Sequence, residues 1–171
     1  MFVLGIDPGL TRCGFGVVAR AADRGAALSA VAAGVLETDV GLGVDLRLAQ
    51  LAGDLAQLLD EFRPDCVVVE RILFQANVRT AVSVAQASGL ALCAAAQRGV
   101  PTAQYSPNEV KQAVVGHGSA SKAQVSAMVA QLCGLSVPPS PPDAADALAL
   151  AICHLSGARL SLAIDAAEAR R

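Results

Sequence analysis

The stretch Phe2-Val3-Leu4-Gly5-Ile6-Asp7-Pro8-Gly9, near the N-terminus, decides how the rest of the sequence is interpreted. Its apolar run predicts a buried strand with Asp7 at the end. Pro8 disfavours a helical conformation at Asp7, and Gly9 suits a tight turn. A second apolar run at 15–19 predicts the return strand of a hairpin. A carboxylate inside a sheet is costly unless a cation meets it, so we expect a divalent metal ion beside Asp7.

Length and composition favour a single domain. The chain has 171 residues, of which 54% are hydrophobic, enough for one large core. Its most apolar helical stretch, 81–96, is shorter than the roughly 20 residues that span a bilayer. No basic segment typical of a signal peptide precedes the first strand, and the five cysteines form no CxxC pair. We therefore predict a cytoplasmic protein with reduced thiols and no membrane segment.

The formal net charge of −2 does not by itself indicate a polyanionic partner. The total is misleading if four of the 15 acidic residues bind metal, because 11 acids then stand against 13 lysines and arginines. Where the charges lie matters more for binding such a partner than their sum.

Hydrophobic periodicity predicts an α/β fold, with a mixed five-stranded sheet flanked by helices. Strands are expected at 2–7, 14–20, 28–38, 65–70 and 101–105, and helices at 44–62, 77–98, 107–115, 120–133 and 143–155. The first three strands should form an antiparallel meander, and the strand ending at Glu70 should lie parallel to the one ending at Asp7. We expect residues 1–158 to form the domain and 159–171 to be a charged, flexible tail.

Helix 77–98 is small and apolar on nearly every face, which predicts burial on more than one side. One sheet can cover only one side, so we expect a second subunit on the other and hence a homodimer through this helix. A charge at Ala87 or Ala91 should then give a monomer.

Four acids end predicted strands or begin the last helix: Asp7, Glu70, Asp143 and Asp146. Adjacent parallel strands place the first two side by side, and the last two share a helix face. Carboxylate oxygens suit Mg²⁺ or Mn²⁺, and two such ions about 4 Å apart can promote phosphodiester cleavage. Each acid alone has a simpler explanation, such as a turn residue, a helix cap or a surface ion pair. The prediction of a metal site therefore depends on all four together.

Several short motifs follow one another in a specific order. They are Gly5-Ile6-Asp7-Pro8-Gly9, Val69-Glu70, Val110-Lys111-Gln112 with Gly118-Ser119-Ala120-Ser121-Lys122, and Asp143-Ala144-Ala145-Asp146-Ala147-Leu148-Ala149. Over residues 2–155 this set resembles the RuvC family of Holliday junction resolvases. The resemblance implies a ribonuclease-H-like fold and a homodimer that cuts two opposed strands of a four-way DNA junction with Mg²⁺ or Mn²⁺. It also implies a RuvA–RuvB branch-migration complex as partner.

The resemblance also implies roles for individual residues. It implies that four acids are catalytic and bind metal: Asp7, Glu70, Asp143 and Asp146. Lys111 and Lys122, the only lysines of the chain, would lie near the scissile phosphate and contact DNA. The expected reaction is hydrolysis by a metal-activated water that leaves a 5′-phosphate, with Asp7 bridging two ions.

The segment after Glu70 should contact the junction. The family has an aromatic side chain there that stacks on bases at the junction centre, and Phe74 is the candidate, with Leu73 at a competing position. Further implied DNA contacts are Arg71, Asn77 and Arg79. Arg12, beside the first hairpin turn, is a weaker candidate.

Three other functions are compatible with parts of the pattern. An actin-like nucleotide-binding protein would share Asp7-Pro8-Gly9-Leu10-Thr11, but it needs two domains and this chain has the length of one. A non-catalytic junction-binding module would bind DNA without the acids. A shorter, RNA-cleaving relative of the resolvases would lack the helices at the end of the chain.

Overall fold

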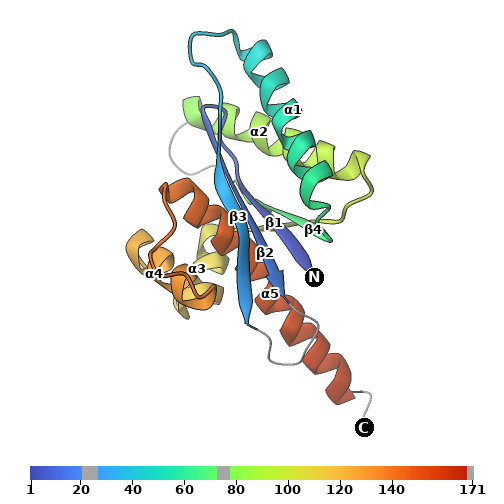
Figure 1. Cartoon of the computed structure of the whole chain (residues 1–171), viewed down its shortest axis with the longest axis vertical. Helices are drawn as coiled ribbons and strands as arrows, with labels where there is room; N and C mark the ends of the chain where they lie inside the picture. The colour runs from blue at the N-terminus through green and yellow to red at the C-terminus, as the bar shows by residue number, and fades with distance from the viewer. Residues whose placement is uncertain (21–26, 73–77, 169–171) are drawn as a thin grey trace.

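The structure is a computed structural model. It describes the backbone of residues 1–20, 27–72 and 78–168, and the side chains of these residues except 78–80 and 158–168. The described residues form a five-stranded mixed sheet with helices on both faces (Figure 1). The predicted α/β fold class is therefore confirmed.

The sheet places the strand that ends at Asp7 in its centre. The strands are β1 (Phe2–Asp7), β2 (Arg12–Arg20), β3 (Leu28–Glu37), β4 (Cys66–Glu70) and β5 (Thr102–Tyr105). Their order across the sheet is β3-β2-β1-β4-β5. β1, β2 and β3 form the predicted antiparallel meander, whereas β4 runs parallel to both β1 and β5. The strand that ends at Glu70 thus lies directly beside β1.

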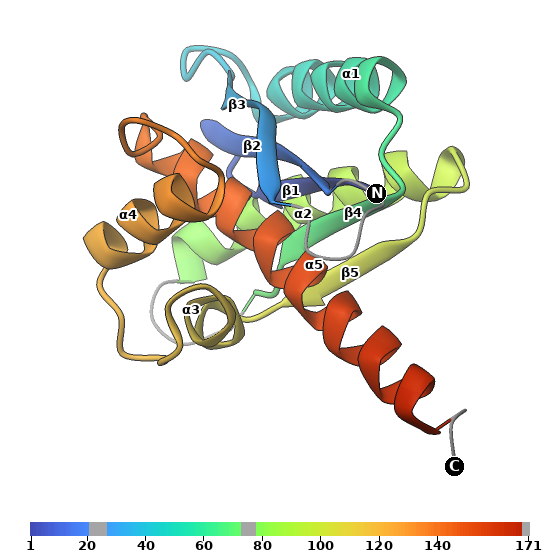
Figure 2. The same cartoon turned by 60° about the horizontal axis from the view of Figure 1, so that its bottom comes forward.

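The helices divide between the two faces of the sheet. They are α1 (Val44–Phe62), α2 (Val78–Gln97), α3 (Pro107–Val115), α4 (Lys122–Leu132) and α5 (Pro142–Glu168). α1 and α2 cover one face, while α5 crosses the other face with α3 and α4 packed against it (Figure 2). None of the helices in the described part of the chain combines the length and hydrophobicity of a transmembrane segment.

Alternation along the central strands decides which side chains face α5. In β1, Leu4 and Ile6 pack toward α1 and α2, and Val3 packs toward α5. Because successive strand residues point to opposite faces, Asp7 shares the α5 face with Val3. Val67 and Val69 of β4 likewise pack toward α1 and α2, which leaves Glu70 on the α5 face with Val68.

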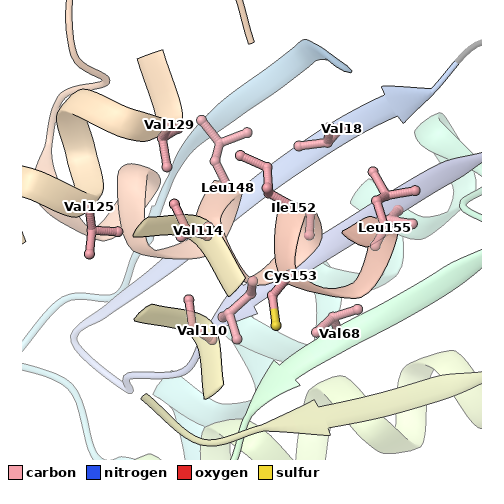
Figure 3. Packing of buried hydrophobic residues seen from close by; sticks show 14 of the residues in the cluster. Val18, Val68, Val110, Val114, Val125, Val129, Leu148, Ile152, Cys153 and Leu155 are labelled. Carbon is pink, nitrogen blue, oxygen red and sulfur yellow. The ribbon is translucent and has the colours of Figure 1, made fainter. Parts of the chain in front are cut away.

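The core on the α5 face is built from branched aliphatic side chains. Leu148, Ile152 and Leu155 of α5 are buried against Val18 and Val68 of the sheet (Figure 3). α3 and α4 complete this cluster with a second layer of valines: Val110, Val114, Val125 and Val129. The first turns of α5 are thereby held over the sheet at the end where β1 and β4 finish.

Two glycines let α5 approach the sheet closely. A Cβ atom on Gly5 would lie 2.0 Å from the carbonyl oxygen of Ala147, and one on Gly14 would lie 2.2 Å from the carbonyl oxygen of Asp143. Both distances are far below van der Waals contact, so any larger residue would push the helix away. The glycines thus bring the backbone of α5 against β1 and β2.

The prediction that the last helix ends near Leu155 is wrong, because α5 continues to Glu168. Residues 156–168 include four alanines and two leucines, which favour helix, and no proline interrupts them. Figure 2 shows these last turns extending beyond the sheet. The domain limit at 158 and the flexibility of 159–171 remain predictions.

The positions chosen to test a dimer were wrong. Ala87 and Ala91 of α2 are 0% and 2% exposed because they pack against the sheet within the single chain. A charge at either position would disrupt the core whether or not a dimer forms. The opposite side of α2 is open, with Val82 55% exposed. The homodimer itself remains a prediction.

Candidate active site

Four carboxylates converge where β1 and β4 end and α5 begins. Asp7 and Glu70 come from neighbouring parallel strands and face α5. Asp143 and Asp146 lie in the first turns of α5, whose backbone is packed against β1 and β2. The N-terminal end of a helix also favours negative charge. Residues from distant parts of the sequence thus form one acidic cluster.

The acids of the cluster shift one another's pKa values. Burial, followed by the negative charges of Glu70, Asp146 and Asp143, raises the pKa of Asp7 from 3.8 to about 7, against a smaller opposing effect of Lys122. The pKa of Glu70 is also raised, first by burial and then by Asp146. Buried carboxylates with raised pKa values in one cluster are typical of functional sites. The sheet side of the cluster therefore has an excess of negative charge.

Lys122 belongs to the same cluster. Its Nζ atom donates to Asp146 Oδ2 at 2.7 Å. This hydrogen bond, together with the charges of Asp146, Asp7 and Glu70, raises the pKa of Lys122 against the opposing effect of burial. Lys122 is the first residue of α4, and the side chain of Ser121 caps that helix by accepting from the Gln124 amide at 3.3 Å. The predicted lysine is thus placed beside the acids by a well-capped helix.

Arg12 is a member of the cluster that sequence analysis underestimated. Its Nε atom donates to Asp143 Oδ2 at 3.0 Å, and its Nη1 atom donates to the carboxylate of Glu37. We expected Arg12 only as a weak candidate for contacting DNA. One sequence feature could have pointed to this role. Arg12 follows Asp7 by five residues, so it lies at the same end of the sheet as the acids.

The chemistry of the cluster fits a divalent cation, although the present side-chain arrangement does not enclose one. In the part of the chain that the structure describes, no three His, Cys, Asp or Glu side chains are arranged to hold a metal ion. The donors are carboxylate oxygens, which Mg²⁺ and Mn²⁺ prefer. One oxygen of Asp143 and one of Asp146 are already paired with cations. An ion would therefore bind most readily to the unpaired oxygens and to the sheet acids.

Lys111 is not in this group. It lies half-buried on α3, and the charges that shift the pKa values of Asp7 and Glu70 include Lys122 but not Lys111. Lys111 has no ion-pair partner among the side chains of residues 1–20, 27–72 and 81–157. Within the described residues, Lys111 is therefore not paired with the acids of the cluster, and its predicted contact with the phosphate remains a prediction.

The structure describes only part of the segment that is predicted to contact DNA. The exposed Arg71 side chain pairs with Glu109 at 3.3 Å and donates to the carbonyl oxygen of Gln104 at 2.9 Å. Phe74, its competitor Leu73, Asn77 and the side chain of Arg79 lie outside the described residues. Of the expected DNA contacts in this segment, the structure therefore places only Arg71, at the edge of β5 and α3.

Comparison with known proteins gives a clear family assignment. The family model "Crossover junction endodeoxyribonuclease RuvC" matches residues 3–154. The chain belongs to the RuvC family. RuvC of Streptomyces avermitilis is 54% identical over 91% of this chain and 87% of its own length. RuvC of Salinispora arenicola is 54% identical over 100% of this chain and 98% of its own length.

Solved RuvC structures share the fold throughout. Thermus thermophilus RuvC is 38% identical, with a TM-score of 0.87 over 94% of this chain and 97% of that one. The same protein in complex with a Holliday junction substrate gives a TM-score of 0.84 at 35% identity, over 94% of this chain and 96% of that one. The yeast mitochondrial resolvase Ydc2, 18% identical with a TM-score of 0.61 over 90% of this chain and 77% of its own, shares the fold. The ribonuclease-H-like fold that the resemblance implied is therefore confirmed.

Proposed function

We propose that this protein is a crossover junction endodeoxyribonuclease that hydrolyses two opposed strands of a four-way DNA junction. The observation that carries the proposal is the convergence of Asp7, Glu70, Asp143 and Asp146, with Lys122 among them, in a chain of the RuvC family. These acids would hold Mg²⁺, for which Mn²⁺ can substitute, with two ions per site as the expected number.

A divalent ion at this site would lower the pKa of the attacking water and stabilise negative charge on the phosphate. The protein contributes a rigid position for each group. Asp7 and Glu70 are fixed by adjacent hydrogen-bonded strands, and Asp146 by the packed start of α5. The Lys122 ammonium group can exchange Asp146 for a phosphate oxygen, a suitable partner for a compact point charge. Lys111, without an ion-pair partner in the described residues, is free to bind a neighbouring phosphate.

The DNA contacts beyond the cluster follow from family membership. We expect Arg71, Asn77 and Arg79 to contact the backbone or bases, and Phe74 to stack at the junction centre. We also expect the protein to act together with a RuvA–RuvB branch-migration complex.

Two opposed cuts require two sites related by a twofold axis, which a symmetric homodimer supplies. The outer side of α2 is the candidate interface. Val82, Gln86, Gly89 and Cys93 are exposed on it at spacings of four, three and four residues, so they form one continuous stripe. A Cβ atom on Gly89 would meet nothing within 4 Å, which leaves room for a close partner.

The dimer is tested at exposed positions of this stripe. Val82→Glu and Cys93→Glu should give monomers in calibrated light scattering while keeping the thermal transition of the folded chain. Val137→Glu, a matched change at a side chain that is 67% exposed between α4 and α5, should remain dimeric. Dimers in both stripe variants would place the interface elsewhere.

The nuclease activity is tested with a labelled four-way junction in Mg²⁺ or Mn²⁺, beside a linear duplex. Paired nicks on opposite junction strands are expected for the wild type, with none in the duplex and none for Asp7→Asn. The variant should still bind the junction. Binding without cleavage by the wild type in either metal would favour a non-catalytic junction-binding module.

A further inference from the structure

Arg12 connects two carboxylates that belong to different elements of the fold. It is the first residue of β2, and its register partner on β3 is Glu37. The guanidinium group donates through Nη1 to Glu37 and through Nε to Asp143 Oδ2, the latter at 3.0 Å. A single side chain thus links the end of the edge strand to the first turn of α5.

The backbone at Asp143 is already fixed without Arg12. A Cβ atom on Gly14 would lie 2.2 Å from the carbonyl oxygen of Asp143 and 3.1 Å from its Cβ atom, so β2 and α5 are in direct contact there. What remains free at Asp143 is the rotation of its side chain. The hydrogen bond from Arg12 restricts that rotation by holding one of the two carboxylate oxygens.

We propose that Arg12 is a positioning residue that holds Asp143 Oδ2, so that Oδ1 is presented to the metal ion, and that Glu37 in turn holds Arg12. The proposal rests on the proposed nuclease function and deepens it. Arg12 does not touch substrate in this role, and it acts only through Asp143.

A role in folding stability explains the arrangement poorly. The side chains of Arg12, Asp143 and Glu37 are 43%, 32% and 63% exposed, and ion pairs with such exposure contribute little to stability. Orientation of a ligand does not need a strong ion pair, because it requires only that one rotamer be favoured. Hydrogen-bonding partners of metal ligands commonly have this effect, and their loss weakens metal binding about 10- to 100-fold.

The fork of arginine suits this role better than a lysine would. Nε and Nη1 lie in one rigid plane and reach two carboxylates at once, whereas the single ammonium group of lysine is a point charge on a flexible stem. Arg12→Lys therefore keeps the charge and loses the double contact. Arg12→Gln loses both, so the pair of variants separates charge from geometry.

The main competing role is direct contact between Arg12 and a DNA phosphate. A lost phosphate contact weakens junction binding and lowers the salt dependence of that binding by about one unit of slope. A lost positioning contact leaves junction affinity unchanged and weakens metal binding in the absence of DNA. The two roles thus predict opposite results in two separate measurements.

The experiment measures Mn²⁺ affinity of the DNA-free protein by calorimetry, junction affinity at several salt concentrations without divalent metal, and cleavage under single-turnover conditions. Arg12→Gln should bind Mn²⁺ about tenfold more weakly and cut correspondingly more slowly, with unchanged junction affinity and salt slope. Arg12→Lys should recover part of the Mn²⁺ affinity. Glu37→Gln, which leaves Arg12 and Asp143 in place, should cause a smaller loss in the same direction.

Arg98→Gln is the matched control, because Arg98 makes a two-point ion pair with Asp60 at the other end of the sheet. It should leave Mn²⁺ affinity unchanged. The proposal is overturned if Arg12→Gln, folded by thermal melting, binds Mn²⁺ like the wild type, or if its junction affinity and salt slope fall instead. A wild type that binds Mn²⁺ but cuts no junction would refute the nuclease function alone, since the Mn²⁺ measurement still tests Arg12.

Discussion

The two halves of the acidic cluster differ in how their charge is compensated. On the sheet, Asp7 and Glu70 are partly buried, have raised pKa values and form no ion pair in the described part of the chain. On α5, Asp143 is paired with Arg12 and Asp146 with Lys122. The sheet half therefore has unbalanced negative charge that a divalent ion would neutralise. The helix half is balanced by side chains that DNA or metal can displace.

The largest expected difference between the halves is in catalysis. Asp7→Asn and Glu70→Gln should each lower single-turnover cleavage by about 1000-fold or more, since metal-ion stabilisation of several kcal/mol corresponds to a factor of ten per 1.36 kcal/mol. Asp143→Asn should lose less, because Arg12 already satisfies one oxygen of Asp143. Equal losses of cleavage in all three variants would show that charge compensation does not make the two halves differ in catalysis.

The second prediction concerns how much the unbalanced negative charge of Asp7 lowers the stability of the folded protein. The pKa of Asp7 is raised on folding from 3.8 to about 7, so between these values the folded protein binds a proton that the unfolded chain has lost. This contribution to stability is present below about pH 4 and is lost as the pH rises to 7, by about 4 kcal/mol in the free energy of unfolding, because each pKa unit corresponds to about 1.36 kcal/mol.

Asp7→Asn should remove this pH dependence and raise the stability of the metal-free protein at pH 8. The measurement is urea unfolding in EDTA at pH 5 and pH 8 for the wild type and the variant. Because groups outside the acidic cluster titrate equally in both proteins, the difference between them reports Asp7 together with the charges coupled to it. A variant that is less stable than the wild type at pH 8 would contradict the prediction.

The sheet half of the cluster was predictable from the sequence, because strand periodicity is local. The alternation of Leu4 and Ile6 with Gly5 and Asp7 is visible in six residues, and the same rule places Glu70. Once these strands are parallel neighbours, the two acids must share a face. The capping box of α3 is a similarly local pattern, visible in Ser106-Pro107-Asn108-Glu109.

The contacts of the helix half could not be predicted in this way. The pairing of β2 with β3 sets Arg12 opposite Glu37, but Asp143 lies far away in the sequence, and the packing of α5 on Gly14 brings it to Arg12. The choice of test positions on α2 was wrong for a related reason. Its small residues occur on all sides, so periodicity did not show that Ala87 faces the sheet. Nothing in the sequence separated Lys111 from Lys122, yet in the described part of the chain Lys122 pairs with Asp146 and Lys111 forms no ion pair.

The third prediction concerns a substitution that disrupts the contact between β1, in the sheet half, and α5, in the helix half. Gly5→Ala places a methyl group 2.0 Å from the carbonyl oxygen of Ala147, so α5 must move away from β1. We expect a loss of about 2 kcal/mol in the free energy of unfolding, together with weaker cleavage. Gly53→Ala on the exposed side of α1 meets nothing within 4 Å and should be neutral or slightly stabilising. Equal stability of the two variants in urea unfolding would mean that α5 adjusts without cost.

The smallest expected effect on stability comes from removing the cation of the helix half. The Lys122 side chain is 79% exposed, so Lys122→Gln should change the free energy of unfolding by less than about 1 kcal/mol. Its positive charge lowers the pKa values of Asp7 and Glu70, so the variant should lose more stability than the wild type between pH 5 and pH 8. Cleavage should nevertheless fall about 10- to 100-fold, because the phosphate loses a charged partner. Urea unfolding at both pH values and single-turnover cleavage measure these effects separately. A variant that cuts normally would restrict Lys122 to balancing Asp146, and would leave Lys111 as the lysine that contacts the phosphate.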